Sequence, residues 1–479
     1  MRKSDFNRAY AFFYAGEVME EIKQNKMGTE SVVKLVWKMG LPMIVSMILQ
    51  SVYNIVDTAF VINMGEDGVA GNLALTYAFP VQLLIIAIGV GTGVGINALL
   101  SKQLGEKNAD GAKRTVGNGI FLGLVIYAVF LIFGLFGCSA FIAMQAHGDE
   151  KVIKMGTNYL KICCCFSFGS IGYTVYERFL QATGKTLLST IAQISGAVCN
   201  IILDYVFIYP LNMGIEGAGW ATVIGQILSL AVAMIFHYGF NKDVENGLKA
   251  LIPDGKTIKS IYKIGISATI MQGLLSVMML GLTAVFGTVN GKETSELLQG
   301  SFGIYYKIMQ FALFASFGIS NTIISLLSYN YGLKDKVRAK DCVKHGILSA
   351  VIVSAVITVL FESLAVPLAK LFGMASGEGG AEIQSVVIKA VRIASIGYVF
   401  MAFSVAVQGV LQALGYAVSP LIISFLRLCA LVMPVAYLFT LSGNPVNVVW
   451  WAFPIVEVAT AVFSAVMLKL ACRKKISVL

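Results

Sequence analysis

The chain has 479 residues, of which 57% are hydrophobic and 13% are charged, and its formal net charge is +10. Ordinary soluble domains carry about 25% charged residues, so this composition excludes a cytosolic enzyme, a secreted disulfide-stabilised domain and a disordered chain. A mean hydropathy of +0.78 predicts a protein surrounded mostly by lipid. Its positive charge is then expected in cytoplasmic loops, and no nucleic-acid partner is expected.

The N-terminal region contains no apolar stretch of the kind that signal peptides carry. Residues 1–33 are therefore expected to form a cytoplasmic tail.

Twelve segments that follow this tail are long and apolar enough to cross a bilayer as helices of about 20 residues. The second and eighth are too long for one straight span and are expected to tilt or to extend beyond the bilayer. The sequence therefore predicts an all-α polytopic membrane protein with twelve transmembrane helices. The expected limits are 34–62, 69–100, 116–140, 157–183, 187–210, 216–240, 261–287, 297–331, 344–366, 384–414, 418–441 and 447–470.

The distribution of Lys and Arg predicts the orientation. An even number of spans places both termini on one side. If that side is the cytoplasm, 26 of the Lys and Arg residues fall inside, six fall outside and four lie within spans. Cytoplasmic loops carry the excess of positive charge in membrane proteins, so we expect a multi-pass protein of the cytoplasmic membrane with both termini inside.

The sequence also contains an internal repeat. Residues 101–120 align without gaps to 328–347, with identities that include Gly105 and Gly332, and the stretch 180–184 matches 411–415. The offset between the copies rises along the chain from 225 through 227 to 231. Because each copy holds six spans, both copies enter the membrane from the same side and are expected to form parallel repeats.

This repeat defines the expected domain organisation. The predicted units are an N-lobe over 34–240, a cytoplasmic linker over 241–260, a C-lobe over 261–470 and a cytoplasmic tail over 471–479. Two six-helix lobes that face each other across a central cavity are typical of transporters.

Carboxylates inside membrane spans mark candidate functional sites. Asp57 and Asp204 fall in the outer halves of the first and fifth spans. Tyr53 and Asn200 each precede one of these acids by one helical turn, and Thr222 lies at a similar depth in the sixth span. Two carboxylates in one dry pocket favour a shared proton or cation, whereas the alternative is a satisfied structural hydrogen-bond network.

The repeat offsets favour a functional role for these acids. They place Leu282 opposite Asp57 and Val435 opposite Asp204, so the fold itself does not require acids at these positions. We therefore predict a cation-binding site.

Other polar residues within the spans leave two interpretations open. Glu177 precedes Arg178 and lies nearer the cytoplasm, so it either pairs locally or, with Gln181, lines an ion or substrate pathway.

Arg427 and Glu457 lie on the last two spans and are expected to pair. Pro42 lies inside the first span, where a missing backbone hydrogen bond allows the helix to bend.

Several of these stretches, in this order, resemble the multidrug and toxic compound extrusion (MATE) family. The matching stretches are 40–42, 53–58, 180–184, 200–204 and 214–222. The resemblance covers about residues 30–470 and implies a V-shaped pair of six-helix lobes.

The resemblance also implies export of organic cations in exchange for H⁺ or Na⁺. Carried over by position, Tyr53, Asp57, Asn200, Asp204 and Thr222 look like the first-lobe ion site, with Na⁺ as a possible ligand of the two acids. Pro42 looks like the bending proline of the first helix. One branch of the family has acids in the seventh and tenth spans. This sequence has none over 268–285 or 392–410, which argues against a second-lobe Na⁺ site of that type.

The predicted function is secondary active multidrug efflux by alternating access, with cationic amphipathic small molecules as substrates. A monomer in contact with membrane lipid is expected, with the coupling ion in place of a cofactor. An enzyme is not expected, because no nucleophile–base constellation is present. The main alternative is a flippase for lipid-linked oligosaccharides, which needs cationic side chains along its cavity. A membrane scaffold or receptor without transport activity is a third class.

Overall fold

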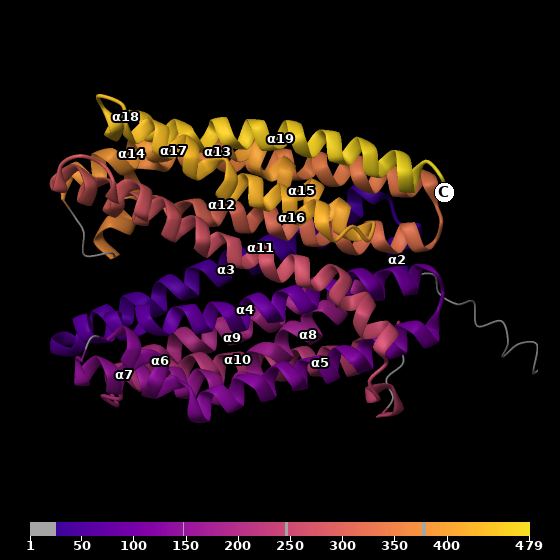
Figure 1. The fold of residues 1–479 in the computed structure, drawn as a ribbon. Coiled ribbons are helices and arrows are strands. Elements are labelled where there is room, and N and C mark those ends of the chain that lie inside the picture. Colours follow the sequence, from indigo (N-terminus) through magenta and orange to yellow (C-terminus); the bar gives the residue numbers. More distant parts are fainter. Residues whose placement is uncertain (1–24, 147, 245–247, 376–379) are drawn as a thin grey trace, which may run out of the picture.

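The helices of the protein run along one common direction in two bundles that lie side by side (Figure 1). The computed structural model describes residues 25–146, 148–244, 248–375 and 380–479, and the regular elements in these ranges are all helical. The all-α membrane fold with two lobes is therefore confirmed. We call the bundle of α3–α10 the N-bundle and the bundle of α11–α19 the C-bundle.

The N-bundle follows a short helix, α2 (Lys26–Thr29), and is followed by the 3-10 turn η2 (Leu248–Leu251) in the connection to the C-bundle. Its elements are α3 (Val32–Ile62), η1 (Gly65–Asp67), α4 (Gly68–Gly105), α5 (Ala109–Phe136), α6 (Cys138–Gln145), α7 (Glu150–Cys165), α8 (Phe168–Ala182), α9 (Thr186–Ile208) and α10 (Gly214–Phe240).

The C-bundle repeats this plan with more interruptions. Its elements are α11 (Gly255–Gly287), α12 (Lys292–Gly332), α13 (Lys336–Ala375), α14 (Ala381–Ser395), α15 (Tyr398–Ala413), α16 (Val418–Phe425), η3 (Leu426–Ala430), α17 (Val432–Thr440), α18 (Pro445–Val448), η4 (Val449–Trp451), α19 (Ala452–Ala471) and η5 (Cys472–Ile476).

Each predicted span corresponds to one helix or to two or three consecutive helical elements. Ten helices of the described ranges are long and apolar enough to cross a membrane, and the α14–α15 pair, bent by 54°, makes an eleventh. The remaining predicted span, 157–183, is divided between α7 and α8. The helix is interrupted there because Ser167 and Gly169 donate to carbonyls three residues earlier, which tightens the turn.

The predicted excess length of the second and eighth spans is confirmed. α4 has 38 residues and α12 has 41, so at about 1.5 Å per residue each exceeds the roughly 30 Å hydrocarbon core. α13 is also longer than predicted, with 40 residues.

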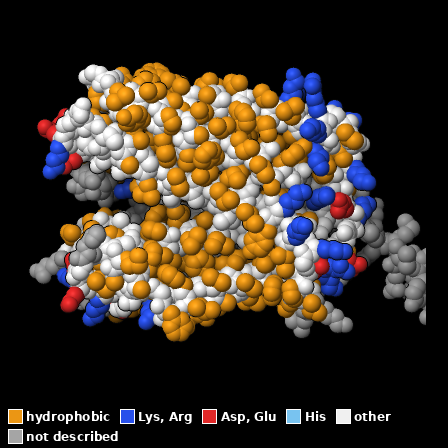
Figure 2. All heavy atoms as spheres, in the orientation of Figure 1, with side chains coloured by type: hydrophobic (Ala, Val, Ile, Leu, Met, Phe, Trp, Pro, Cys, Tyr) orange, Lys and Arg blue, Asp and Glu red, His pale blue; other side chains and the backbone are white. Residues whose placement is uncertain are grey.

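The surface divides into an apolar band and a basic end. In Figure 2, hydrophobic side chains cover the middle of the visible face, whereas Lys and Arg gather at the end where α2 and the C-terminus lie. We call this the basic end. At the other end the surface is hollowed between the two bundles (Figure 2).

The two bundles touch through glycines of α4. A Cβ at Gly95 would lie 2.2 Å from the carbonyl oxygen of Ile261 on α11, and one at Gly105 would lie 2.0 Å from that of Tyr329 on α12. Such contacts require glycine, because helix backbones approach closely only where no side chain separates them. The bundles are therefore packed backbone to backbone toward the basic end.

Candidate ion and substrate site

Helix α3 carries Tyr53 and Asp57 one turn apart, and Pro42 lies inside the same helix. The Pro42 carbonyl oxygen accepts a hydrogen bond of 2.9 Å from the hydroxyl of Thr190 on α9. This bond joins α3 to the helix that carries the second acid, at the point where proline weakens the α3 hydrogen-bond ladder.

Helix α9 presents Asn200 and Asp204 to the interior of the N-bundle. Asn200 is 4% exposed and Asp204 is 0% exposed. Asp204 and Asp57 are close enough for their charges to interact, as are Asp57 and Tyr53. The structure thus brings the two acids of α3 and α9 into one region of the N-bundle.

Five buried polar atoms of Asp57, Asn200 and Asp204 lack hydrogen-bond partners among the described residues. These atoms are Oδ1 of Asp57, both carboxylate oxygens of Asp204, and the amide oxygen and nitrogen of Asn200. Leaving a buried polar group unsatisfied costs about 1–3 kcal/mol, and more for a charged group. A proton or a small cation would remove this cost, because carboxylate and amide oxygens are the ligands that hard cations prefer.

The unpartnered groups of this region are two carboxylates and one amide. No group of three or more His, Cys, Asp and Glu side chains that could hold a metal is found in the part of the chain that the structure describes. Two carboxylates and neutral oxygens match a proton or Na⁺, for which Asp57, Asp204 and Asn200 supply the oxygens.

A cavity of about 100 Å³ opens between α3, α4, α8, α9 and α10. We call it the N-bundle cavity. Three of the five predicted site residues, Tyr53, Asn200 and Thr222, lie on its wall, together with Glu177 and the glycines and apolar residues of α4. Asp57 and Asp204 lie beside these wall residues, one turn farther along α3 and α9.

A second polar network lies on the same cavity and is centred on α8. Arg178 donates to the Gln181 side-chain oxygen at 2.8 Å, and Gln181 donates to Glu177 at 2.9 Å. Arg178 and Glu177 also form an ion pair of 3.8 Å, with side chains 1% and 5% exposed. Of the two interpretations of Glu177, local pairing is therefore realised, and Glu177 lines the cavity as well.

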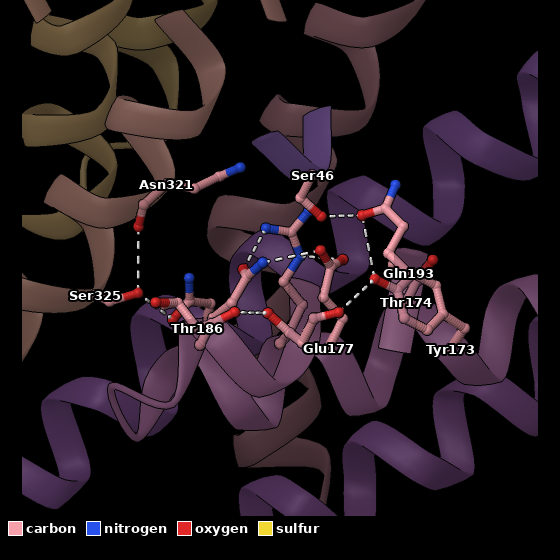
Figure 3. A network of polar contacts seen from close by, with 12 residues as sticks. Ser46, Tyr173, Thr174, Glu177, Thr186, Gln193, Asn321 and Ser325 are labelled. Atoms are coloured by element: carbon pink, nitrogen blue, oxygen red, sulfur yellow. Dashed lines mark hydrogen bonds and ion pairs between the residues drawn. The ribbon is translucent and has the colours of Figure 1, made fainter. Parts of the chain in front are cut away.

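Sequence reasoning missed the polar residues that join α3, α8 and α9. Figure 3 shows Ser46 and Tyr173 pointing at the side chain of Gln193, whose amide oxygen accepts hydrogen bonds from both hydroxyls. The spacing on α9 could have identified Gln193. It precedes Asn200 by seven residues and so lies on the same helical face.

One side chain of this region connects the two bundles. Asn97 on α4 accepts hydrogen bonds from Ser101 at 3.2 Å and from Ser325 on α12 at 3.0 Å. Ser325 and Asn321 lie next to the α8 network in Figure 3. These hydrogen bonds join α4 of the N-bundle to α12 of the C-bundle.

The C-bundle lacks the acid pair, as the repeat predicts. Leu282, at the position that corresponds to Asp57, is fully buried. The predicted pairing of Arg427 with Glu457 is confirmed, with 3.8 Å between Nε and Oε1 and side chains 4% and 15% exposed.

Comparisons with known proteins agree with this arrangement. The MatE family model matches residues 42–206 and 267–438, one segment in each bundle. Multidrug export protein MepA of Staphylococcus aureus (strain N315) is 26% identical over 426 residues, which cover 88% of this chain and 90% of MepA. MepA of Staphylococcus saprophyticus is 23% identical over 422 residues, with the same two coverages.

Solved structures share the fold. An outward-facing multidrug resistance MATE family transporter of the MOP superfamily superposes with a TM-score of 0.86 at 21% identity, covering 94% of this chain and 99% of its own. A MOP superfamily transporter from Pyrococcus furiosus gives 0.84 at 22% identity, covering 95% and 98%. With the two-bundle fold and a family match in both halves, the chain belongs to the MatE family of multidrug efflux transporters.

Proposed function

We propose that the protein exports organic, mostly cationic, compounds in exchange for inward H⁺ or Na⁺. The observation that carries this proposal is the pair of acids on α3 and α9, in which Oδ1 of Asp57 and both carboxylate oxygens of Asp204 are buried without a hydrogen-bond partner within the described residues. Removing or adding one positive charge changes the electrostatic energy of such a pair strongly. The pair is therefore suited to exchange a coupling ion.

The exchange requires two states that differ in affinity for ion and substrate. The bundles meet through Gly95 and Gly105 toward the basic end, and the surface is hollowed at the other end (Figure 2). We infer that the basic end faces the cytoplasm, with both termini, and that this conformation opens outward. Closure of the outer end and opening of the basic end would give the second state.

Ion binding is expected to act through α3. This helix carries Tyr53 and Asp57, contains Pro42 and is bonded to α9 through Thr190. When an ion neutralises the acids, α3 can bend at Pro42 and reshape the N-bundle cavity, which lowers the affinity for a bound cation. Glu177 and Gln181, on the same cavity network, would serve as the inner part of the ion or substrate pathway.

The flippase alternative is not favoured. A pyrophosphate-linked substrate requires free cationic side chains, but Arg178, on the wall of the N-bundle cavity, is occupied by Glu177 and Gln181. The multidrug export relatives also support a small-molecule substrate. A monomer in contact with membrane lipid is sufficient for this cycle.

The test is ethidium efflux from vesicles that contain the full chain, under an imposed pH gradient and then under an imposed Na⁺ gradient. We expect one gradient to drive efflux. If neither gradient drives efflux of any cationic dye, the proposed exchange is wrong.

A further inference from the structure

A second buried cavity, of about 20 Å³, lies in the C-bundle around Arg427 and Glu457. The rest of its wall is apolar, with Met278, Met309 and Met401 among its residues. Among the described residues, Nε and Nη1 of Arg427 and Oε2 of Glu457 have no hydrogen-bond partner. We call it the C-bundle cavity.

The C-bundle cavity is the repeat counterpart of the N-bundle cavity. With the offsets of the internal repeat, 225 in the first span and 231 from the fourth span on, Met278 corresponds to Tyr53 and Phe453 to Thr222. All four residues line their respective cavities. The polar hydroxyl groups of the N-bundle wall are thus replaced by a thioether and a phenyl ring in the C-bundle.

The charged residues of the C-bundle cavity obey the same correspondence. Arg427 corresponds to Gly196 and Glu457 to Gln226, and all four again line the two cavities. A side chain at Gly196 has no room, because its Cβ would lie 1.9 Å from the Ser229 hydroxyl oxygen. The counterpart segment is instead the π-helical turn η3, Leu426–Ala430, which departs from α-helical geometry at the residue that carries the guanidinium.

Arg427 is therefore a positive charge, fixed to the chain, at the place that matches the N-bundle cavity. Its partner Glu457 also faces Tyr398 of α15 and Tyr305 of α12 closely enough to interact with both. Glu362 of α13 lies within range of Tyr398. On α14, Lys389 bonds to Asn447, and Arg392 is exposed.

We propose that the Arg427 guanidinium is a tethered cation that occupies a latent cation site at Glu457, so that the C-bundle exchanges no ion of its own. The site would otherwise take a proton or a small monovalent cation, the same class of ligand as the N-bundle site. This inference rests on the proposed ion exchange at Asp57 and Asp204. On this proposal, the N-bundle of the duplicated protein responds to ions and the C-bundle does not.

The test removes the N-bundle acids first, so that the two sites are separated. Full-length D57N/D204N protein is purified in detergent, and R427Q, R427K or R427Q/E457Q is added to that background. Thermal unfolding is then followed over a series of Na⁺ concentrations and pH values. We expect R427Q to gain a dependence on Na⁺ or pH, with a higher unfolding temperature when the ion or proton is bound.

The matched controls define the outcome. R427K keeps a tethered positive charge, and R427Q/E457Q lacks the carboxylate, so neither should gain ion dependence. If R427Q behaves like R427Q/E457Q, the proposal is overturned. If R427Q does not fold, E457Q in the same background decides: we expect no change of ion response, and loss of an existing response would show that Glu457 already exchanges ions.

The same series separates this inference from the function on which it rests. If wild type and D57N/D204N respond alike to ions, the proposed N-bundle site is wrong. The comparison of R427Q with R427Q/E457Q still reports on the C-bundle alone.

Discussion

Gly105 on α4 and Tyr329 on α12 meet backbone to backbone at the basic end, where a Cβ on Gly105 would lie 2.0 Å from the Tyr329 carbonyl oxygen. The repeat-related Gly332 makes the reciprocal contact, since a Cβ on Gly332 would lie 2.2 Å from the carbonyl oxygen of Lys102. The two glycines occupy the same position in the two copies of the repeat, and each brings its own bundle into backbone contact with the other at the basic end.

A side chain at Gly105 should weaken this closure. G105A must push α4 and α12 apart, and overpacking of this kind costs about 1–3 kcal/mol, enough to lower the population of the closed basic end about tenfold. We expect several-fold slower dye efflux from vesicles. G239A on α10 is the control, because a Cβ there meets nothing within 4 Å. Equal efflux by the two variants would contradict the role of the glycine contact.

The N-terminal segment provides a second prediction. Arg338 on α13 donates to the carbonyl oxygens of Met27 at 2.8 Å and Glu30 at 2.9 Å, and to Asn330 at 2.9 Å. Asn25 donates to Thr183 of the N-bundle, so residues 25–30 bridge both bundles at the basic end.

R338M should loosen this bridge, since hydrogen bonds from charged donors contribute about 1.5–3 kcal/mol. We expect faster hydrogen exchange over residues 26–30 and reduced efflux. K340M, on the same helix with an exposed side chain, is the matched control. Unchanged exchange in R338M would mean that the bridge adds no stability.

The network on α8 predicts non-additive effects. R178M leaves the carboxylate of Glu177 buried without its cation, and breaking a buried pair costs about 3–5 kcal/mol. We expect R178M to lower the unfolding temperature markedly and R178M/E177M to recover part of the loss. A double-mutant cycle in detergent measures the coupling. Additive losses would show that the two side chains do not act as a pair.

A pH effect is expected at the start of α11, outside the span. Hydrogen bonds from the hydroxyl and backbone N–H of Thr257 hold the pKa of Asp254 below its ordinary value of 3.8. A lowered carboxyl pKa stabilises the folded state above the ordinary value, and this contribution is lost as the pH falls through the folded-state pKa. D254A should therefore unfold at a lower temperature than wild type at neutral pH, with the difference shrinking in acid. A constant difference would contradict this account.

The sequence was sufficient for the fold because lipid imposes simple rules. Long apolar segments must be helical in a membrane, so α3, α4 and α12 were predicted close to their observed positions. The repeat predicted two bundles. The few identical stretches in the two halves reveal the duplication even though most other side chains differ.

The interruptions were harder to predict. The breaks at Ser167 and at Ile396–Gly397 arise from local hydrogen bonding inside apolar segments, where hydropathy does not change. The π-helical turn at Arg427 could not be predicted either, because hydrophobic periodicity over so few residues does not distinguish a π-helical turn from an α-helical one.

Estimating the membrane depth of each polar residue from its position along its span grouped residues from α3, α9 and α10. This was possible because few charged residues lie inside the spans. The same estimate missed Ser46, Tyr173 and Gln193, since these neutral side chains are common in membrane helices and acquire meaning only when α3, α8 and α9 pack. Whether Glu177 pairs with Arg178 also depends on side-chain geometry, which sequence spacing does not determine.

If Asp57 and Asp204 exchange the coupling ion, gradient-driven ethidium efflux from vesicles is the most direct test of their role. Wild type should respond to a pH or Na⁺ gradient, whereas D57N and D204N should each lose that response while the protein remains folded and binds dye. The double variant should be no worse than either single variant, because the two carboxylates act as one site. Full gradient-driven efflux by D57N or D204N would contradict the account.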